Sequence, residues 1–109
     1  MDRRIKIAKK FVERNFAKPL KVKDLARRLR LTPLHFGRLF KKEAGQSFKH
    51  FVLACRMKRA RSLMLLDPSL AIKDVAWQVG YSYEHLCVFT RDFEKYWGYP
   101  PSECRKAAA

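Results

Sequence analysis

Apolar residues recur at spacings of three and four along most of the chain, which is the period of amphipathic helices. The first stripe, Ile5, Ala8, Val12 and Phe16, predicts a helix over residues 2–16. The later apolar stripes predict six more helices, over residues 22–30, 33–44, 48–66, 72–80, 82–97 and 101–106. The pattern therefore predicts an all-α fold.

One segment of the chain occurs twice. Residues 20–32 are matched fifty residues later by residues 70–82. Each copy predicts a short helix, a tight turn and a second helix, which is the order of a helix-turn-helix. A threonine followed by proline, Thr32-Pro33, is a strong signal for the start of a helix. Two copies in one chain make this interpretation far more specific than one copy would.

The repeat also predicts the organisation of the domain. We expect a first helix-turn-helix at about residues 20–45, a linking helix at about 48–66 and a second helix-turn-helix at about 70–98. The glycines expected to end the second helix of each copy, Gly45 and Gly98, are 53 residues apart, whereas Thr32 and Ser82 are 50 apart. We therefore expect Ser82 to cap a second helix that contains three additional residues.

The charge makes a polyanion the first candidate partner. The 109 residues carry a net charge of +15. Such a charge indicates a nucleic-acid partner or, less often, an acidic membrane face. The alternative is a basic surface that only keeps the protein soluble. Residues 1–61 hold 20 Lys and Arg against 4 acidic residues, whereas residues 62–109 hold 5 against 6. Any electrostatic footprint is therefore expected in the first half.

Composition also argues against several other classes. The three cysteines form no metal-ligand spacing, so no metal and no cofactor is expected, and isolated thiols fit a reducing cytosol. No apolar run reaches the length of a membrane span, and no nucleophile–base set or paired carboxylates indicate an enzyme. We expect a cytoplasmic, nucleoid-associated protein with no membrane partner. Four residues are expected in the core because their neighbours in the sequence are apolar: Cys55, Cys87, Trp77 and Trp97.

The series of residues along the chain resembles the DNA-binding domain of AraC-type (AraC/XylS) bacterial transcription regulators. The residues that carry this resemblance run in family order over almost the whole chain: Leu25, Ala26, Leu29, Leu31, Thr32, Leu39, Phe40, Lys41, Lys42, Gly45, Ser47, Phe48, Arg56, Ala60, Leu63, Ile72, Asp74, Val75, Ala76, Val79, Gly80, Tyr81, Ser82, Phe89, Arg91, Phe93, Gly98, Pro101 and Arg105. The resemblance implies a seven-helix domain with two recognition helices in adjacent major grooves of double-stranded DNA. Two features depart from the family pattern: two additional residues between Gly80 and Phe89, and Cys104 at a place that is commonly aromatic.

The resemblance also places base-reading positions in the first recognition helix, at Leu34, Gly37 and Arg38. The fork of Arg38 can bond guanine O6 and N7 together, and Leu34 can touch a thymine methyl. The alternatives are an ion pair between Arg38 and Glu43 or Asp24, and a core or rim position for Leu34. Gly37 can add only a close backbone approach. Phosphate contacts are expected from four residues, Thr32, Lys41, Lys42 and Ser82, with a solvated face as the alternative for the lysines.

In the second recognition helix, the resemblance implies a DNA contact for Arg91. Tyr83, Glu84 and His85 are expected at the amino end of that helix, where groove contacts are made. Glu84 can accept from cytosine N4 or simply stabilise the helix N-terminus. His85 can equally be a surface or capping residue.

The charge distribution leads to a hypothesis about how much each copy of the repeat contributes to DNA binding. The first helix-turn-helix and the helix over residues 2–16 would supply most of the DNA affinity, while the second copy would engage weakly or face a protein such as RNA polymerase. The alternative function is a basic helical RNA-binding or polymerase-interaction module without operator specificity. Most relatives carry an effector-binding or dimerising domain, and we expect that domain to be absent from this chain.

Overall fold

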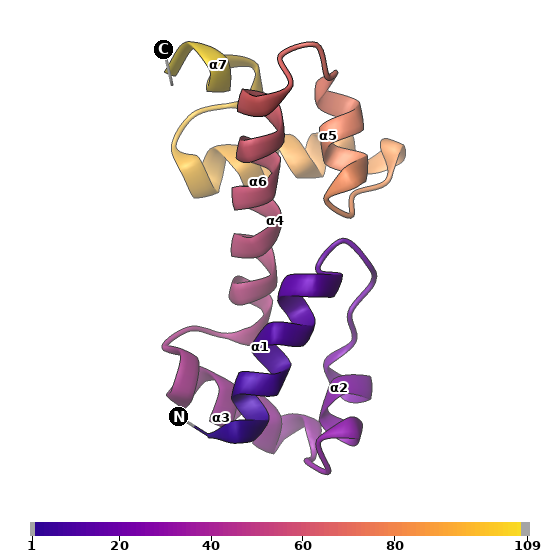
Figure 1. Cartoon of the computed structure of the whole chain (residues 1–109), viewed down its shortest axis with the longest axis vertical. Helices are drawn as coiled ribbons and strands as arrows, with labels where there is room; N and C mark the ends of the chain where they lie inside the picture. The colour runs from indigo at the N-terminus through magenta and orange to yellow at the C-terminus, as the bar shows by residue number, and fades with distance from the viewer. Residues whose placement is uncertain (1, 108–109) are drawn as a thin grey trace. The chain divides into compact units, whose positions relative to one another are not determined.

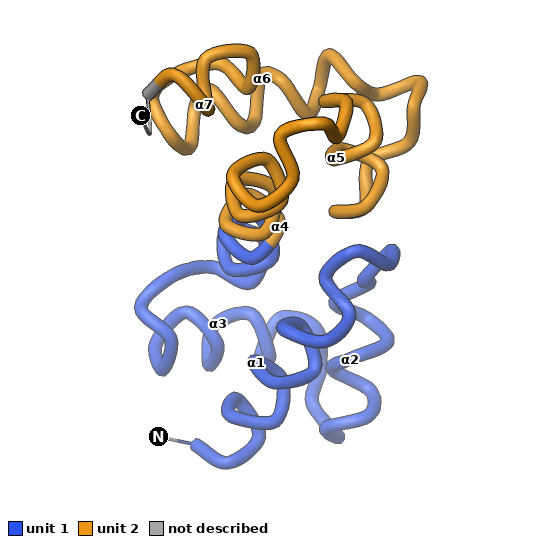
Figure 2. The backbone as a smooth tube through the Cα atoms, turned by 45° about the horizontal axis from the view of Figure 1, so that its top comes forward, with its two compact units in different colours: residues 1–55 blue, residues 56–109 orange. Residues whose placement is uncertain are grey.

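The computed structural model describes residues 2–107, which are all-α as predicted (Figure 1). The chain divides into two compact units, unit 1 (residues 1–55) and unit 2 (residues 56–109) (Figure 2). The described residues form seven α-helices: α1 Arg3–Asn15, α2 Val22–Arg28, α3 Pro33–Ala44, α4 Phe48–Leu66, α5 Ile72–Gln78, α6 Leu86–Trp97 and α7 Cys104–Ala107. They also form two short 3-10 helices, η1 Tyr83–His85 and η2 Pro101–Glu103.

Unit 1 consists of α1, α2, α3 and the first part of α4 around one core. Ile5, Ala8 and Val12 on α1 are fully buried, as are Phe36 and Phe40 on α3. The aromatic rings of α3 continue into α4 through edge-on contacts with Phe48 and Phe51. Burial of these rings fixes which side of α3 faces inward and leaves the opposite side free.

Local chemistry fixes both ends of α3. The Thr32 hydroxyl accepts a hydrogen bond from the His35 N–H at 3.1 Å, and Pro33 occupies the first helical position. At the other end Gly45 adopts a left-handed φ of 78°, which glycine tolerates and which ends the helix. The predicted bounds of α3 are confirmed, as are those of α4.

Unit 2 has the remainder of α4, then α5, η1, α6, η2 and α7. Its core includes Val75 from α5, Val79 directly after that helix, and Phe89 and Phe93 from α6, all fully buried. Cys104 is also fully buried.

Arg105 fastens the C-terminal segment of unit 2 to the end of α4. Its guanidinium donates to the carbonyl oxygens of Met64 at 2.9 Å and of Asp67 and Leu70 at 3.1 Å each. Carbonyls at a helix C-terminus lack intrahelical donors, so this side chain satisfies groups that would otherwise need water. The half-buried Trp97 also reaches α4, because its indole N–H donates to the Met57 carbonyl at 3.1 Å.

The prediction for the second recognition helix was wrong in one respect. Ser82 does not cap α6, and the three additional residues lie outside the helix as η1. The Ser82 hydroxyl lies 2.6 Å from the ring Nδ1 of His85, so it does not bond the helix backbone. α6 begins only at Leu86 and has 12 residues, the same length as α3.

Two predictions of core residues were also wrong. Trp77 is 59% exposed, because it lies on the side of α5 opposite the buried Val75 and Val79. Cys87 is exposed, because it is two residues before Phe89 on α6, and positions two apart do not share a helix face. The predicted last helix over 101–106 is a 3-10 turn followed by α7.

Candidate nucleic-acid interface

The outward face of α3 carries the residues predicted to read DNA. Leu34 is 65% exposed, and Arg38, Lys41 and Lys42 are exposed on the same side of the helix. Gly37 is half-buried beside them, and a Cβ built on it would meet nothing within 4 Å. The structure therefore brings the predicted residues of the first recognition helix onto one accessible surface.

Arg38 has no internal partner to hold it. Among residues 2–107 it forms neither a hydrogen bond nor an ion pair, so the alternative pairing with Glu43 or Asp24 is not present. The core alternative for Leu34 also fails, because most of its side chain is exposed. The guanidinium of Arg38 and the apolar side chain of Leu34, one helical turn apart, are thus both free to bind a ligand.

The two recognition helices match residue by residue at an offset of 53. Phe36 and Phe40 of α3 correspond to Phe89 and Phe93 of α6, and all four rings are fully buried. Gly45 and Gly98, with φ of 78° and 88°, end the two helices in the same conformation. The turns before them still match at an offset of 50, since η1 adds three residues in between.

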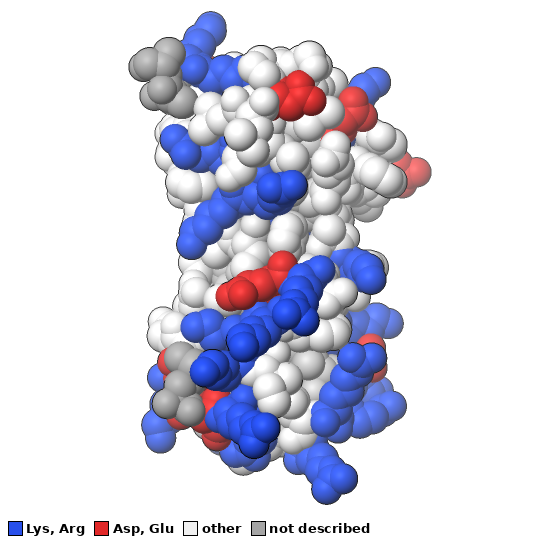
Figure 3. Space-filling view, viewed as in Figure 1, with Lys and Arg blue, Asp and Glu red and all other residues white. Residues whose placement is uncertain are grey.

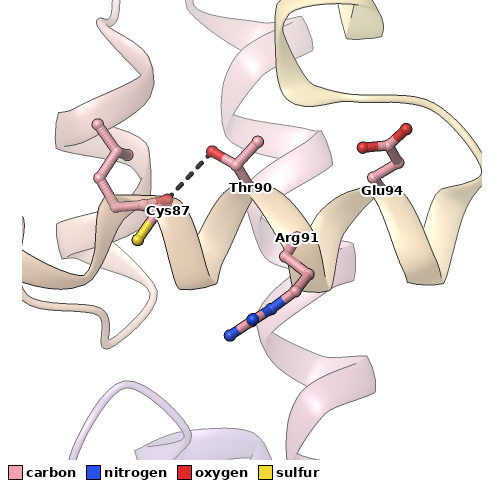
Figure 4. Close-up of a pocket in the computed structure, with 5 residues that line it drawn as sticks. Cys87, Thr90, Arg91 and Glu94 are labelled. Carbon is pink, nitrogen blue, oxygen red and sulfur yellow. Dashed lines mark hydrogen bonds between the residues drawn. The ribbon is translucent and has the colours of Figure 1, made fainter.

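This offset identifies the outward residues of α6. Arg91 corresponds to Arg38 and is exposed, and Cys87 corresponds to Leu34. The face includes a shallow recess lined by five residues: Leu86, Cys87, Thr90, Arg91 and Glu94 (Figure 4). Thr90 bonds the Leu86 carbonyl, and Arg91 extends from the helix away from Glu94 (Figure 4).

Cys87, Glu94 and Lys95 are face residues that the sequence analysis missed. The signal that reveals them is the 53-residue spacing of the paired phenylalanines and glycines, applied to the helix itself. At that spacing Lys41 and Lys42 correspond to Glu94 and Lys95. One cation of the first face is thereby replaced by an anion in the second.

The predicted trio Tyr83, Glu84 and His85 forms η1 instead of the first turn of α6. The Tyr83 hydroxyl donates to Asp74 at 3.2 Å, and the His85 ring contacts Ser82. Partial desolvation and the bond to the Asp74 carboxylate both raise the pKa of the Tyr83 hydroxyl. Glu84 is exposed and forms no hydrogen bond or ion pair within residues 2–107.

An exposed pair of aromatic rings lies beside this turn. Trp77 and Tyr83 stack with centroids 6.3 Å apart and planes 8° from parallel, and Tyr83 is 55% exposed. Contiguous exposed apolar surface marks interaction sites more often than scattered apolar residues do. The sequence signal for this pair is the helix phase of Trp77, which is two residues from Val75 and so lies on the opposite side of α5.

The charges differ strongly between the two units. Unit 1 holds 16 Lys and Arg against 4 acidic residues, and unit 2 holds 9 against 6. On the face shown in Figure 3, basic side chains crowd the surface of α1 and the neighbouring part of unit 1. A dense positive potential of this kind attracts the phosphate backbone of nucleic acids.

Sites of other kinds are not found in the part of the chain that the structure describes. Residues 2–107 contain no group of three or more His, Cys, Asp or Glu side chains able to hold a metal ion. No helix in that range is long and apolar enough to cross a bilayer.

Two helix-turn-helix motifs with outward recognition helices define a DNA-binding protein of the double helix-turn-helix class. A family model described as a helix-turn-helix domain matches residues 25–107. The chain belongs to the AraC-type DNA-binding domains of bacterial transcription regulators. Domains of this family bind DNA in proteins that regulate transcription.

The chain is also similar to individual bacterial regulatory proteins and to solved DNA-binding domains. The chain is 34% identical over 98 residues to the Msm operon regulatory protein of Streptococcus mutans, covering 90% of this chain and 34% of that protein. It thus spans about a third of the length of this relative. The C-terminal domain of AraT, a response regulator from Geobacillus stearothermophilus, superimposes with a TM-score of 0.89 at 29% identity, covering 97% of this chain and 86% of that one. The DNA-binding domain of AdpA, solved in complex with a target DNA, has the same fold with a TM-score of 0.81 at 20% identity, covering 98% and 93%.

Proposed function

We propose that the chain binds a specific double-stranded DNA site through the outward faces of α3 and α6, placed in adjacent major grooves. The observation that carries this proposal is the free, exposed Arg38 on a well-capped α3. A capped helix with fixed inward rings holds its outward side chains in a defined register, which recognition of base edges requires. We propose the domain boundaries at about residues 20–45, 48–66 and 70–98 for the two motifs and their linking helix.

In the first recognition helix, Arg38 bonds O6 and N7 of a guanine, and Leu34 packs on a thymine methyl. Gly37 lets the DNA come close to the backbone of α3, because no side chain fills the space outside it. Lys41, Lys42 and the Thr32 segment contact phosphates, which positions the helix without reading sequence. The last-turn lysines also suit the negative end of the helix dipole.

In the second recognition helix, Arg91 is the main DNA contact, in the position that corresponds to Arg38. Tyr83, Glu84 and His85 approach the groove from η1, and Ser82 lies near a phosphate. This surface carries less positive charge, because Glu94 corresponds to Lys41. Since affinity from phosphate neutralisation scales with the number of cations in contact, unit 1 supplies most of the DNA affinity.

RNA polymerase is the proposed protein partner of unit 2, as the alternative to contact of Tyr83 and Glu84 with DNA. The exposed pair of Trp77 and Tyr83, with Asp74 and Glu84 beside it, offers aromatic area and negative charge at one surface. Aromatic rings supply most of the energy in many protein interfaces, and carboxylates select a basic counterpart. The proposed place of action is the nucleoid in the cytoplasm.

The test begins with selection of bound sequences from random duplex DNA, followed by affinity measurements against salt. Arg38→Ala should cost about 1–3 kcal/mol on the selected site and relax the preference at one base pair. Lys41→Gln should weaken binding to all duplexes alike and reduce the salt slope by about 1. Arg91→Ala should cost less than Arg38→Ala.

Three results would contradict these assignments. A larger loss for Arg91→Ala than for Arg38→Ala would reverse the roles of the two helices. Equal affinity for an RNA duplex of the same length would favour a basic RNA-binding module. Unchanged binding of purified RNA polymerase to a Trp77→Ala/Tyr83→Ala variant would remove the partner assigned to unit 2.

A further inference from the structure

We propose that the outward side of α1 is a second DNA-binding surface, which holds the phosphate backbone of a second duplex segment. The domain would then bridge two duplexes, one on α3 and one on α1. The bridging rests on the proposed function of α3, whereas duplex binding by α1 does not.

The surface is a row of four cations, the α1 stripe, formed by Arg3, Lys6, Lys10 and Arg14. All four are exposed, and their spacings of three, four and four residues place them on one side of the helix. The fully buried residues of α1, Ile5, Ala8 and Val12, lie on the other side. In Figure 3 basic side chains run along α1 on the visible face.

The α1 stripe is not explained by contacts within the protein. Among residues 2–107 none of its four members forms an ion pair or a hydrogen bond through its side chain, and Asp2 pairs with Arg4 instead, at 3.1 Å. Like charges on neighbouring turns destabilise a helix. At the N-terminus of α1 the Asp2 cap already supplies an anion, so the repulsion within the row is the effect left uncompensated. An external anion would relieve it.

The length of the stripe fits a nucleic-acid backbone. Arg3 and Arg14 are eleven residues apart, so the stripe is about 16 Å long at roughly 1.5 Å per residue. Double-stranded DNA carries one negative charge per roughly 1.7 Å of its axis, counted over both strands. A straight row of four cations of this length therefore lies opposite several phosphates of a duplex.

The core of unit 1 separates the stripe from the recognition face. α1 packs against α3, with Ile5 and Val12 buried in the same cluster as Phe36 and Phe40, and α1 crosses in front of α3 in Figure 1. Arg38 points outward from α3, away from those rings. A straight duplex docked on α3 cannot also lie along the α1 stripe, so the stripe must take a second segment.

Two charge-matched variants test this proposal. The stripe variant removes three cations of α1: Lys6→Gln, Lys10→Gln and Arg14→Gln. The control variant removes three exposed cations of the same types that have no partner among the described residues: Lys58→Gln, Arg59→Gln and Lys106→Gln. Each protein is loaded on an immobilised duplex of the selected sequence and washed, and a labelled duplex of random sequence is then added.

Wild type and the control variant should capture the second duplex, and sedimentation should show one chain with two duplexes. Capture should weaken roughly 10²-fold between 50 and 200 mM salt, as four phosphate contacts at a slope of about −0.9 each require. The stripe variant should lose capture at low salt and keep its binding to the first duplex.

Several results would overturn the proposal. These are unchanged capture by the stripe variant, an equal loss of the first and second duplexes, or complexes with two chains for two duplexes. Binding of phosphatidylserine vesicles without duplex capture would assign the stripe to an acidic lipid surface. Failure of the proposed function would give a different result. Selection from random duplex DNA would then yield no preferred sequence. Binding to random duplexes would be lost in the stripe variant and kept in Arg38→Ala.

Discussion

Replacing Gly37 by alanine separates stability from recognition at the centre of α3. A glycine inside a helix costs about 0.5–1 kcal/mol relative to alanine, because it loses more backbone entropy on folding. The added Cβ would meet nothing within 4 Å, so no clash offsets this gain. Gly37→Ala should therefore raise the free energy of unfolding by about 0.5–1 kcal/mol.

The same methyl should weaken DNA binding. Gly37 lies between Leu34 and Arg38 on the recognition helix, and a methyl there occupies the space that a closely approaching duplex needs. Forcing one extra carbon into a packed interface typically costs about 1–3 kcal/mol. The variant is thus expected to be more stable and to bind the selected site less tightly.

Gly45→Ala is the matched control, because it adds the same atom to the end of the same helix. Gly45 has a φ of 78°, which costs an L-residue about 1–2 kcal/mol, so this variant should be less stable than wild type. Urea unfolding followed by circular dichroism gives the stability, and fluorescence anisotropy with the selected duplex gives the affinity. A destabilised Gly37→Ala would disprove the open space beside α3, and unchanged affinity would disprove the close approach of DNA.

Three further predictions concern the packing of each unit. Arg105→Ala should destabilise unit 2 by about 2–4 kcal/mol, because it removes three charge-assisted hydrogen bonds. Both Trp residues lie in unit 2, so their fluorescence follows the unfolding of that unit. Lys106→Ala, the control, should change stability by less than about 0.5 kcal/mol. Thr32→Ala should cost about 1 kcal/mol in urea unfolding because it removes a helix cap, and Ser82→Ala should cost clearly less; equal losses would contradict the observed caps. Burial, and after it the hydrogen bond to Asp92, raise the pKa of the Tyr81 hydroxyl. The contribution of this hydroxyl to the free energy of unfolding is therefore complete below about pH 10 and is lost above it at roughly 1.4 kcal/mol per pH unit. Tyr81→Phe should remove this pH dependence.

The sequence predicted those elements whose ends are fixed by local chemistry. Thr32 and Pro33 signal the start of α3, Gly45 signals its end, and Asp67-Pro68 directly follows the end of α4. Each of these signals acts within four residues, so it can be seen without knowledge of the tertiary structure.

The start of α6 could not be predicted in the same way, because Ser82 has two possible partners. Its hydroxyl can cap a backbone N–H or bond a nearby side chain, and in the structure it contacts the His85 ring. No proline follows it to favour the helix, so a 3-10 turn forms first. The exposure of Trp77 was within reach of the sequence, because it lies half a helical turn away from Val75 and Val79.

The three-residue turn changes how the second motif is compared with the first. Counted from the turn, Glu84 would correspond to Leu34, and the second helix would appear to have lost its arginine. Counted from the buried rings, Arg91 corresponds to Arg38, and each helix presents an arginine at the same position relative to its own two buried phenylalanines. Burial decides between the two alignments, because a helix cannot rotate its outward residues without moving its phenylalanines out of the core. The two motifs therefore share one reading scaffold. They differ in the charge around the arginine and in η1, which places additional aromatic and acidic groups beside the second helix.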